Sequence, residues 1–122
     1  MSVEYKWESK GLCRVFTDTI NGDEVLGDNL KLQGDIRFDN IKYVINDFTE
    51  VVDFDFSDLD VTKISVNDNV ASQSNPYLKI ALISTHEPLL VWLRLYCESM
   101  EGSLYKSKIF DNADDAYEWV SE

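Results

Sequence analysis

The chain has 122 residues, of which 44% are apolar and 12% aromatic. This length and composition predict a single folded domain with its own hydrophobic core and exclude a disordered ground state. The 11 basic residues stand against 23 acidic ones, so the formal net charge is -12 at pH 7. That charge opposes binding to nucleic-acid phosphates and to anionic membrane surfaces, and we expect neither as a partner.

Cysteine usage and hydropathy are typical of a cytoplasmic protein. The first ten residues lack the basic start and apolar run of a secretory signal. The longest apolar stretch, 89–93, is much shorter than the roughly 20 residues that span a bilayer. Cys13 and Cys97 each lie in an apolar segment, which suits buried reduced thiols better than a disulfide. We therefore expect a cytoplasmic location and no membrane insertion.

The N-terminal third predicts a β-hairpin and a helix. Apolar and charged side chains alternate over 3–7 with the period of a half-buried strand, and the turn at 9–11 leads into a second strand at 12–17. Asn21 then provides a capping side chain, and the helical run that follows closes at Gly34.

The rest of the chain alternates strands with helices. The expected elements are a strand at 41–48, a helix at 57–71, a strand at 78–84, a helix at 88–101, a strand at 105–110 and a short helix capped by Asn112. The order β-β-α-β-α-β-α-β-α predicts an α/β fold with a mixed five-stranded sheet and about four helices. Its parallel strands are linked by helical crossovers, and the first strand forms an antiparallel edge.

Polar residues that follow the predicted strands form one candidate site, because ligands of open α/β sheets bind beyond the carboxyl ends of the strands. The residues expected there are Asp18, Asp47, Thr85 and Asp111. Converging carboxylates can hold Mg²⁺ or Ca²⁺, yet Asp and Thr also cap the helices that begin at such places. No motif fixes a metal-ligand spacing, so the capping interpretation is preferred and no metal or cofactor is expected.

The segment 46–60 contains six acidic residues and no basic one. It does not fit an EF-hand loop, because position six of a loop that starts at Asp53 is Asp58 instead of glycine. We expect a solvated loop that leads into a helix, with Ser57 as N-cap and Asp58 and Asp60 near the positive end of the helix dipole.

Few residues offer catalytic chemistry. His86 is the only histidine, so a histidine-based zinc site cannot form within one chain. His86 and Glu87 could exchange protons as a general acid/base pair, but no obvious nucleophile accompanies them. The glycines form no phosphate-binding loop. A metal-dependent enzyme built on Asp18, Asp47 and Asp111 is therefore the least favoured function.

Residues Tyr43–Val51 and Asp53–Ser57 resemble the central strand and the following helix start of the SpoIIAA-like branch of the STAS fold. That branch is related to anti-sigma factor antagonists and, more remotely, to CRAL-TRIO lipid-transfer domains. The ending Ala116–Val120 is similar to the terminal helix of the branch. The resemblance covers essentially the whole chain and implies a single domain of this fold.

The resemblance also concerns the phosphorylation motif of the antagonists. There, Asp-Ser-Ser-Gly follows the strand and the first serine accepts phosphate from a partner kinase. The matching positions here are Asp55, Phe56, Ser57 and Asp58, so the acceptor hydroxyl is missing. The resemblance therefore implies a non-catalytic regulatory or protein-binding module without this switch. The expected partner surface consists of Phe54, Asp55, Phe56, Ser57 and Asp58.

Two further expectations concern apolar residues. The alternative function is a carrier of a small apolar ligand or lipid, suggested by the remote lipid-transfer resemblance and by aromatic residues such as Trp92. A tightly packed chain of this length, however, leaves little room for a pocket. The helix at 88–101 also carries Leu90, Val91 and Leu95 outside its main apolar stripe. Either the helix is buried on two sides or a second copy covers these residues, and we predict a homodimer.

Overall fold

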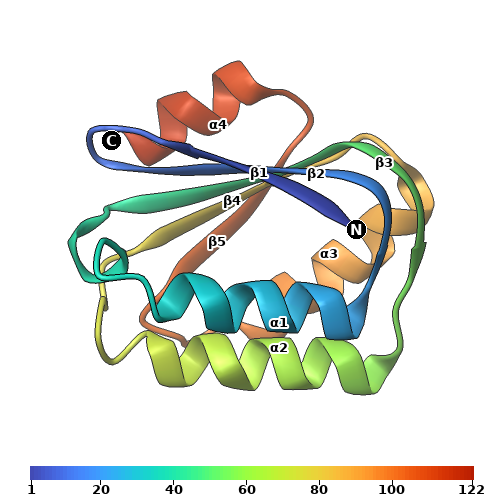
Figure 1. Ribbon diagram of the computed structural model, residues 1–122, viewed down its shortest axis with the longest axis horizontal. Coiled ribbons are helices and arrows are strands. Elements are labelled where there is room, and N and C mark those ends of the chain that lie inside the picture. Colours follow the sequence, from blue (N-terminus) through green and yellow to red (C-terminus); the bar gives the residue numbers. More distant parts are fainter.

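Five strands form one mixed sheet in the computed structural model, which describes residues 1–122 (Figure 1). The strands are β1 (Ser2–Trp7), β2 (Gly11–Asn21), β3 (Tyr43–Asp55), β4 (Lys79–Ile83) and β5 (Lys106–Phe110), and they lie in the sheet in this order. β1 pairs antiparallel with β2, and all other neighbours are parallel. The predicted mixed sheet with an antiparallel edge is confirmed.

Four α-helices connect or follow the parallel strands, as expected. They are α1 (Gly22–Gln33), α2 (Asp58–Ala71), α3 (Glu87–Ser99) and α4 (Ala113–Val120), and a short 3₁₀ turn at Phe38–Asn40 was not predicted. Side chains of Asn21, Ser57 and Asn112 accept backbone hydrogen bonds at the starts of α1, α2 and α4. None of the helices has the length and apolar character needed to cross a lipid bilayer.

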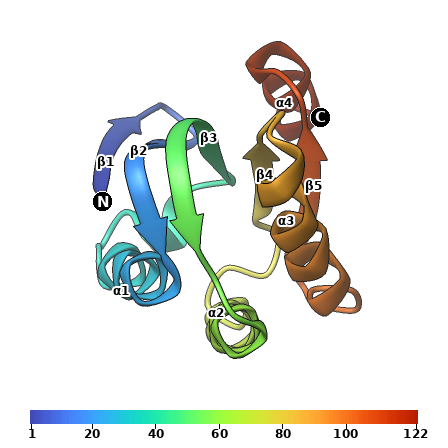
Figure 2. The ribbon, with the colours of Figure 1, turned by 90° about the vertical axis from the view of Figure 1, so that its right-hand side faces the viewer.

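The helices cover the two faces of the sheet unequally. α1, α2 and α3 pack on one face and α4 packs on the other (Figures 1 and 2). Because side chains alternate along a strand, neighbouring residues of β2 face different helices: Leu12 and Phe16 belong to the main core, and Cys13 and Val15 to the smaller α4-side core. The face covered by α1, α2 and α3 therefore holds most of the buried hydrophobic residues.

β2 and β3 continue beyond the rest of the sheet, which corrects the loop expected after residue 48. β4 ends opposite Asp47, and from there to Asp55 strand β3 pairs only with β2. Two shifts of register lie in this ribbon, and each leaves one extra residue on β3. Such bulges increase the local twist of a strand pair. Most of the acidic segment is thus strand.

Cys97, which was expected to be buried, is only half-buried, and so is Trp119. Trp119 of α4 packs against Phe110 at a ring distance of 5.6 Å and lies under the Lys79 ammonium at 5.2 Å. Cys97 of α3 is also half-buried, whereas Cys13 is buried, and both thiols are free. Burial raises the pKa of each thiol, which keeps both in the protonated form at neutral pH.

Candidate functional site

The polar residues that follow the strands lie apart from one another. Asp47 ends the part of β3 that pairs with β4, whereas Asp18 pairs with a residue four positions further along β3, roughly 13 Å away. Asp111 follows β5, two strand spacings or about 10 Å from β3. Thr85 is exposed after β4. No three acidic, histidine or cysteine side chains lie close enough to share a metal ion.

These carboxylates have local roles. Asp47 Oδ1 accepts hydrogen bonds from the backbone N–H of Thr49 at 2.9 Å and from its hydroxyl at 2.7 Å. Asp111 accepts from the side chain of Asn112, the N-cap of α4, at 2.6 Å. Asp18 has a φ of 63°, a left-handed conformation that aspartate tolerates, beside a shift of register. Local turn and bulge geometry accounts for their positions.

Residues 54–58 lie where β3 turns into α2. Ser57 is the N-cap: its hydroxyl accepts from the Asp60 N–H at 3.2 Å, and Asp60 Oδ2 accepts from the Ser57 N–H at 2.9 Å. The predicted capping role of Ser57 is thereby confirmed. The Asp60 side chain also lies against Gly22, where any Cβ would overlap its carboxyl group. The first turns of α1 and α2 therefore meet at this point.

Phe54 and Phe56 belong to an aromatic cluster that joins the end of β3 to α3. The rings of Phe54 and Phe56 stack on each other with centroids 5.9 Å apart. Phe54 also makes a T-shaped contact with His86 at 6.1 Å, and Phe56 lies 6.3 Å from Trp92. Both phenylalanines are half-buried against the main core. Of the predicted partner surface, Asp55, Ser57 and Asp58 are exposed, while the two aromatic rings serve mainly in packing.

The outer face of α2 exposes three aliphatic side chains. Leu59, Val66 and Val70 are 60%, 57% and 68% exposed. Their spacing of seven and four residues places them on one side of the helix, together with Lys63. Asp58 lies at the N-terminal end of this row. We call Leu59, Val66 and Val70 the α2 face.

The patch predicted on α3 is smaller than expected. Leu90 is only 8% exposed, and Leu95 is half-buried against the main core, so Val91 alone is exposed. Leu90 is buried as a member of the main core, together with Leu89 and Leu93 of the same helix. Leu90 is therefore covered by the chain itself, and the proposed dimer patch loses this residue.

A cavity of about 80 Å³ lies between the sheet and helices α1, α2 and α3. Of its 21 lining residues 16 are hydrophobic, so most of the wall is apolar. The polar side chains in the wall are Arg14, Asn29, Gln33, Asn46 and Asp68, joined by the hydroxyl groups of Tyr96 and Tyr105. We call this cavity the chamber. All residues that line the chamber are buried except Gln33, Phe56 and Trp92, which are half-buried. The Phe56–Trp92 ring pair therefore lies at the edge of the chamber.

One side of the chamber holds a buried ion pair. Arg14 of β2 donates from Nη1 to Asp28 Oδ2 and from Nε to Asn46 Oδ1, both at 2.8 Å. Tyr5 donates its hydroxyl to the same Asp28 oxygen at 2.7 Å. Burial, followed by this hydrogen bond, raises the pKa of Tyr5 to about 12. The single cation of the chamber wall is thus already paired.

The other side is organised around Asp68 of α2. Tyr96 of α3 donates to Asp68 Oδ2 at 2.6 Å, while the Asn29 and Gln33 amides of α1 lie 3.4 Å from Oδ1. Burial raises the pKa of Asp68 to about 6, against the opposing effects of the Tyr96 hydrogen bond and of the Arg14 charge. Asp68 is therefore largely ionised at pH 7 and titrates in mildly acidic solution.

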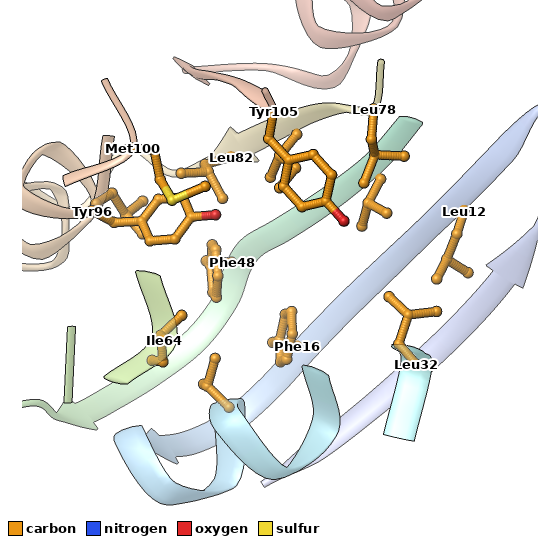
Figure 3. Close-up of a cluster of buried hydrophobic side chains, with 14 of the residues drawn as sticks. Leu12, Phe16, Leu32, Phe48, Ile64, Leu78, Leu82, Tyr96, Met100 and Tyr105 are labelled. Carbon is orange, nitrogen blue, oxygen red and sulfur yellow. The ribbon is translucent and has the colours of Figure 1, made fainter. Parts of the chain in front are cut away.

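Two polar atoms of the chamber wall have no hydrogen-bond partner: Asn29 Oδ1 and the Tyr105 hydroxyl. Asn29 is 6% exposed and Tyr105 is 3% exposed, so neither reaches bulk water. Figure 3 shows the hydroxyl oxygens of Tyr96 and Tyr105 among the apolar side chains of the core. Burial, followed by the charge of Asp68, raises the pKa of Tyr105. A buried polar atom without a partner is costly, so both atoms need an explanation.

The two tyrosines give the first testable prediction. Tyr96→Phe should lower the free energy of unfolding by about 2 kcal/mol, because Asp68 loses its shortest hydrogen bond. Tyr105→Phe should leave it unchanged or raise it by up to about 1 kcal/mol, because the hydroxyl it removes has no partner in the protein. Urea unfolding at pH 7 measures both. An equal loss in the two variants would contradict the assignment.

Sequence reasoning did not identify the chamber, although a signal was present. Arg14 alternates with Leu12 and Phe16 on the core-facing side of β2, and Asn46 interrupts an apolar strand. Asp68 follows Val61 and Ile64 along the buried face of α2. A polar residue at a core-facing position is rare without a specific partner. Their mutual positions, however, depend on how α1 and α2 pack.

Comparison with known proteins identifies the fold. No family model matches the sequence, and no curated protein matches it. Among solved structures, an uncharacterized protein of the DUF3478 family from Shewanella loihica PV-4, described as having a SpoIIAA-like fold, matches with a TM-score of 0.57 and 13% sequence identity. The match covers 98% of this chain and 92% of that chain. At this identity the similarity shows the fold alone, and the predicted SpoIIAA-like fold is confirmed.

Proposed function

We propose that this SpoIIAA-like domain is a non-catalytic cytoplasmic regulatory module that binds a basic protein partner through the α2 face. The observation that carries the proposal is the row of exposed aliphatic side chains on α2 beside exposed carboxylates at the end of β3. Exposed apolar side chains that adjoin one another are typical of interaction surfaces, whereas single exposed ones are ordinary.

Charge favours a basic partner over a second copy. Asp53, Asp55 and Asp58 are all exposed near the N-terminal end of the α2 face, and the whole chain carries a net charge of -12. Two copies joined through this face would bring like charges together, whereas a basic partner would complement them. The homodimer predicted from the sequence is therefore the competing outcome, which the affinity purification described below can detect.

Single residues support the other parts of the proposal, which are the absence of catalysis, regulation without phosphorylation, and a cytoplasmic location. The only imidazole, His86, is exposed at the N-cap of α3 and makes a T-shaped contact with Phe54. This packing role favours a non-catalytic function. Ser57 is engaged in the cap of α2, which favours regulation by partner binding over phosphorylation. Two free thiols favour a reducing compartment such as the cytoplasm.

Affinity purification with quantitative mass spectrometry tests the proposal. The tagged chain is recovered from its native cells at low and at high salt, in parallel with the double variant Val66→Ser, Val70→Ser. Since both side chains are exposed, the fold should be unaffected. We expect one basic protein to be depleted at least about fivefold in the variant and at high salt.

Tyr77→Ser is the matched control, because Tyr77 is 86% exposed and lies outside the α2 face. It should retain the partner fully. Equal recovery of every protein by the wild type and the double variant would contradict the proposal. Recovery of only a second copy of this chain through the α2 face would replace it with the homodimer.

A further inference from the structure

The chamber has features of a ligand site that partner binding at the α2 face does not use. It combines a free volume of about 80 Å³ with two polar atoms that lack partners, Asn29 Oδ1 and the Tyr105 hydroxyl, on side chains that are more than nine-tenths buried. These atoms come from α1 and from the residue before β5, far apart in the sequence. A packing defect lined only by apolar groups would need no occupant, whereas these atoms do.

The two polar atoms without hydrogen-bond partners define the chemistry of the occupant. Asn29 Oδ1 can only accept a hydrogen bond, so the occupant must offer an O–H or N–H donor. The Tyr105 hydroxyl requires an acceptor for its proton, which a hydroxyl or amide oxygen provides and an ammonium group does not. A hydroxyl group and a primary amide each offer both a donor and an acceptor.

Charge excludes the ionic alternatives. Arg14 is the only cation in the wall and is already paired with Asp28. An anionic occupant would therefore face the Asp68 carboxylate without a free counter-charge. A cationic occupant could approach Asp68 but would leave the Tyr105 proton without an acceptor. A neutral occupant is the only class that meets every group in the wall.

Volume sets the size of the occupant. A buried apolar cavity of about 150 Å³ holds one benzene molecule, and the chamber has about 80 Å³. The space fits an apolar body of about three to five non-hydrogen atoms. This is too small for a lipid chain, which narrows the apolar-ligand carrier considered from the sequence to a much smaller class of molecule.

We propose that the chamber is a binding site for a small neutral alcohol or primary amide with a short apolar body, held by Asn29 and Tyr105. The half-buried Phe56–Trp92 pair lies at the edge of the chamber and marks the route of access. Because Phe56 is followed by the N-cap of α2, the occupant would enter beside the helix that carries the α2 face.

A titration followed by two-dimensional ¹H–¹⁵N NMR tests the proposal with isobutanol as the probe. Isobutylammonium and isobutyrate carry the same branched body with a positive or a negative head group, and xenon supplies apolar contact alone. We expect saturable shifts of chamber amides, including those of Asn29 and Phe48, with isobutanol in the millimolar range. The two ions should bind at least about tenfold more weakly, since neither provides the hydrogen bonds that Asn29 Oδ1 and the Tyr105 hydroxyl both lack.

The variant Tyr105→Phe should weaken isobutanol binding at least about fivefold, and its folding is expected to be intact because the lost hydroxyl has no partner in the protein. Tyr77→Phe makes the same chemical change at an exposed site and should bind isobutanol like the wild type. Saturation by xenon without saturation by isobutanol would show an apolar void and overturn the proposal. Absence of any saturable shift would mean that only water occupies the chamber, and it would overturn the proposal as well. Equal isobutanol affinity of Tyr105→Phe and the wild type would also overturn the proposal.

Discussion

Replacing Arg14 with methionine is expected to lower the free energy of unfolding by about 3–5 kcal/mol. The guanidinium group is buried and donates to Asp28 and Asn46. In the variant, the Asp28 carboxylate would stay buried with the Tyr5 hydroxyl as its remaining side-chain donor. A buried charge that loses its partner costs more than the pair itself contributes. Urea unfolding followed by circular dichroism at pH 7 measures the loss.

Two companion variants separate this effect from a general loss of charge. The double variant Arg14→Met, Asp28→Leu removes both ions and should recover most of the stability. Arg94→Met removes an arginine from an exposed pair with Glu87, where the nearest atoms are 3.6 Å apart, and should leave stability nearly unchanged. If Arg14→Met were as mild as Arg94→Met, the Arg14–Asp28 pair would not be buried in solution.

Asp68→Asn is expected to change how stability depends on pH. Burial raises the pKa of Asp68 from 3.8 to about 6 in the folded protein, so between these values the folded state holds a proton that the unfolded state has released. The stabilising contribution of Asp68 to the free energy of unfolding is then fully present below about pH 4 and is lost as the pH rises through 6. The difference between the two pKa values corresponds to about 3 kcal/mol.

The measurement compares unfolding free energies of the wild type and Asp68→Asn from pH 4 to pH 7. Relative to the wild type, the variant should gain stability across this range, because its side chain stays neutral throughout. Asp114→Asn changes an exposed acid in the same way and serves as the control. A constant difference between Asp68→Asn and the wild type would mean that Asp68 keeps an ordinary pKa in the folded protein.

Local signals were sufficient to predict the order of the elements but not the ends of β3. The caps at Asn21, Ser57 and Asn112 are short-range features, and all three form as expected. The strand at 41–48 was placed too short because Glu50 and Asp53 resemble loop residues. Their strand conformation depends on pairing with β2, which is distant in the sequence and therefore invisible to a local pattern.

The chamber depends on contacts that no local pattern contains. Asn29 and Asp68 belong to different helices, and Tyr96 reaches Asp68 from a third. The sequence shows polar residues at core-facing positions, but their partners are set by the packing of the helices on the sheet. Leu90 illustrates the same limit, because its burial in the main core follows from how α3 packs on the rest of the fold.

The length of β3 gives the acidic residues around position 50 a protective role. Beyond Asp47 one edge of β3 has no neighbouring strand, because β4 ends at Ile83. An open strand edge is a template for pairing with other molecules and hence for aggregation. Glu50, Asp53 and Asp55 place negative charge along this stretch, and the bulges twist it away from a flat edge. We therefore expect these acids to oppose pairing of the ribbon with other chains, and strongly acidic solution, where carboxylates become neutral, is where this protection would fail first.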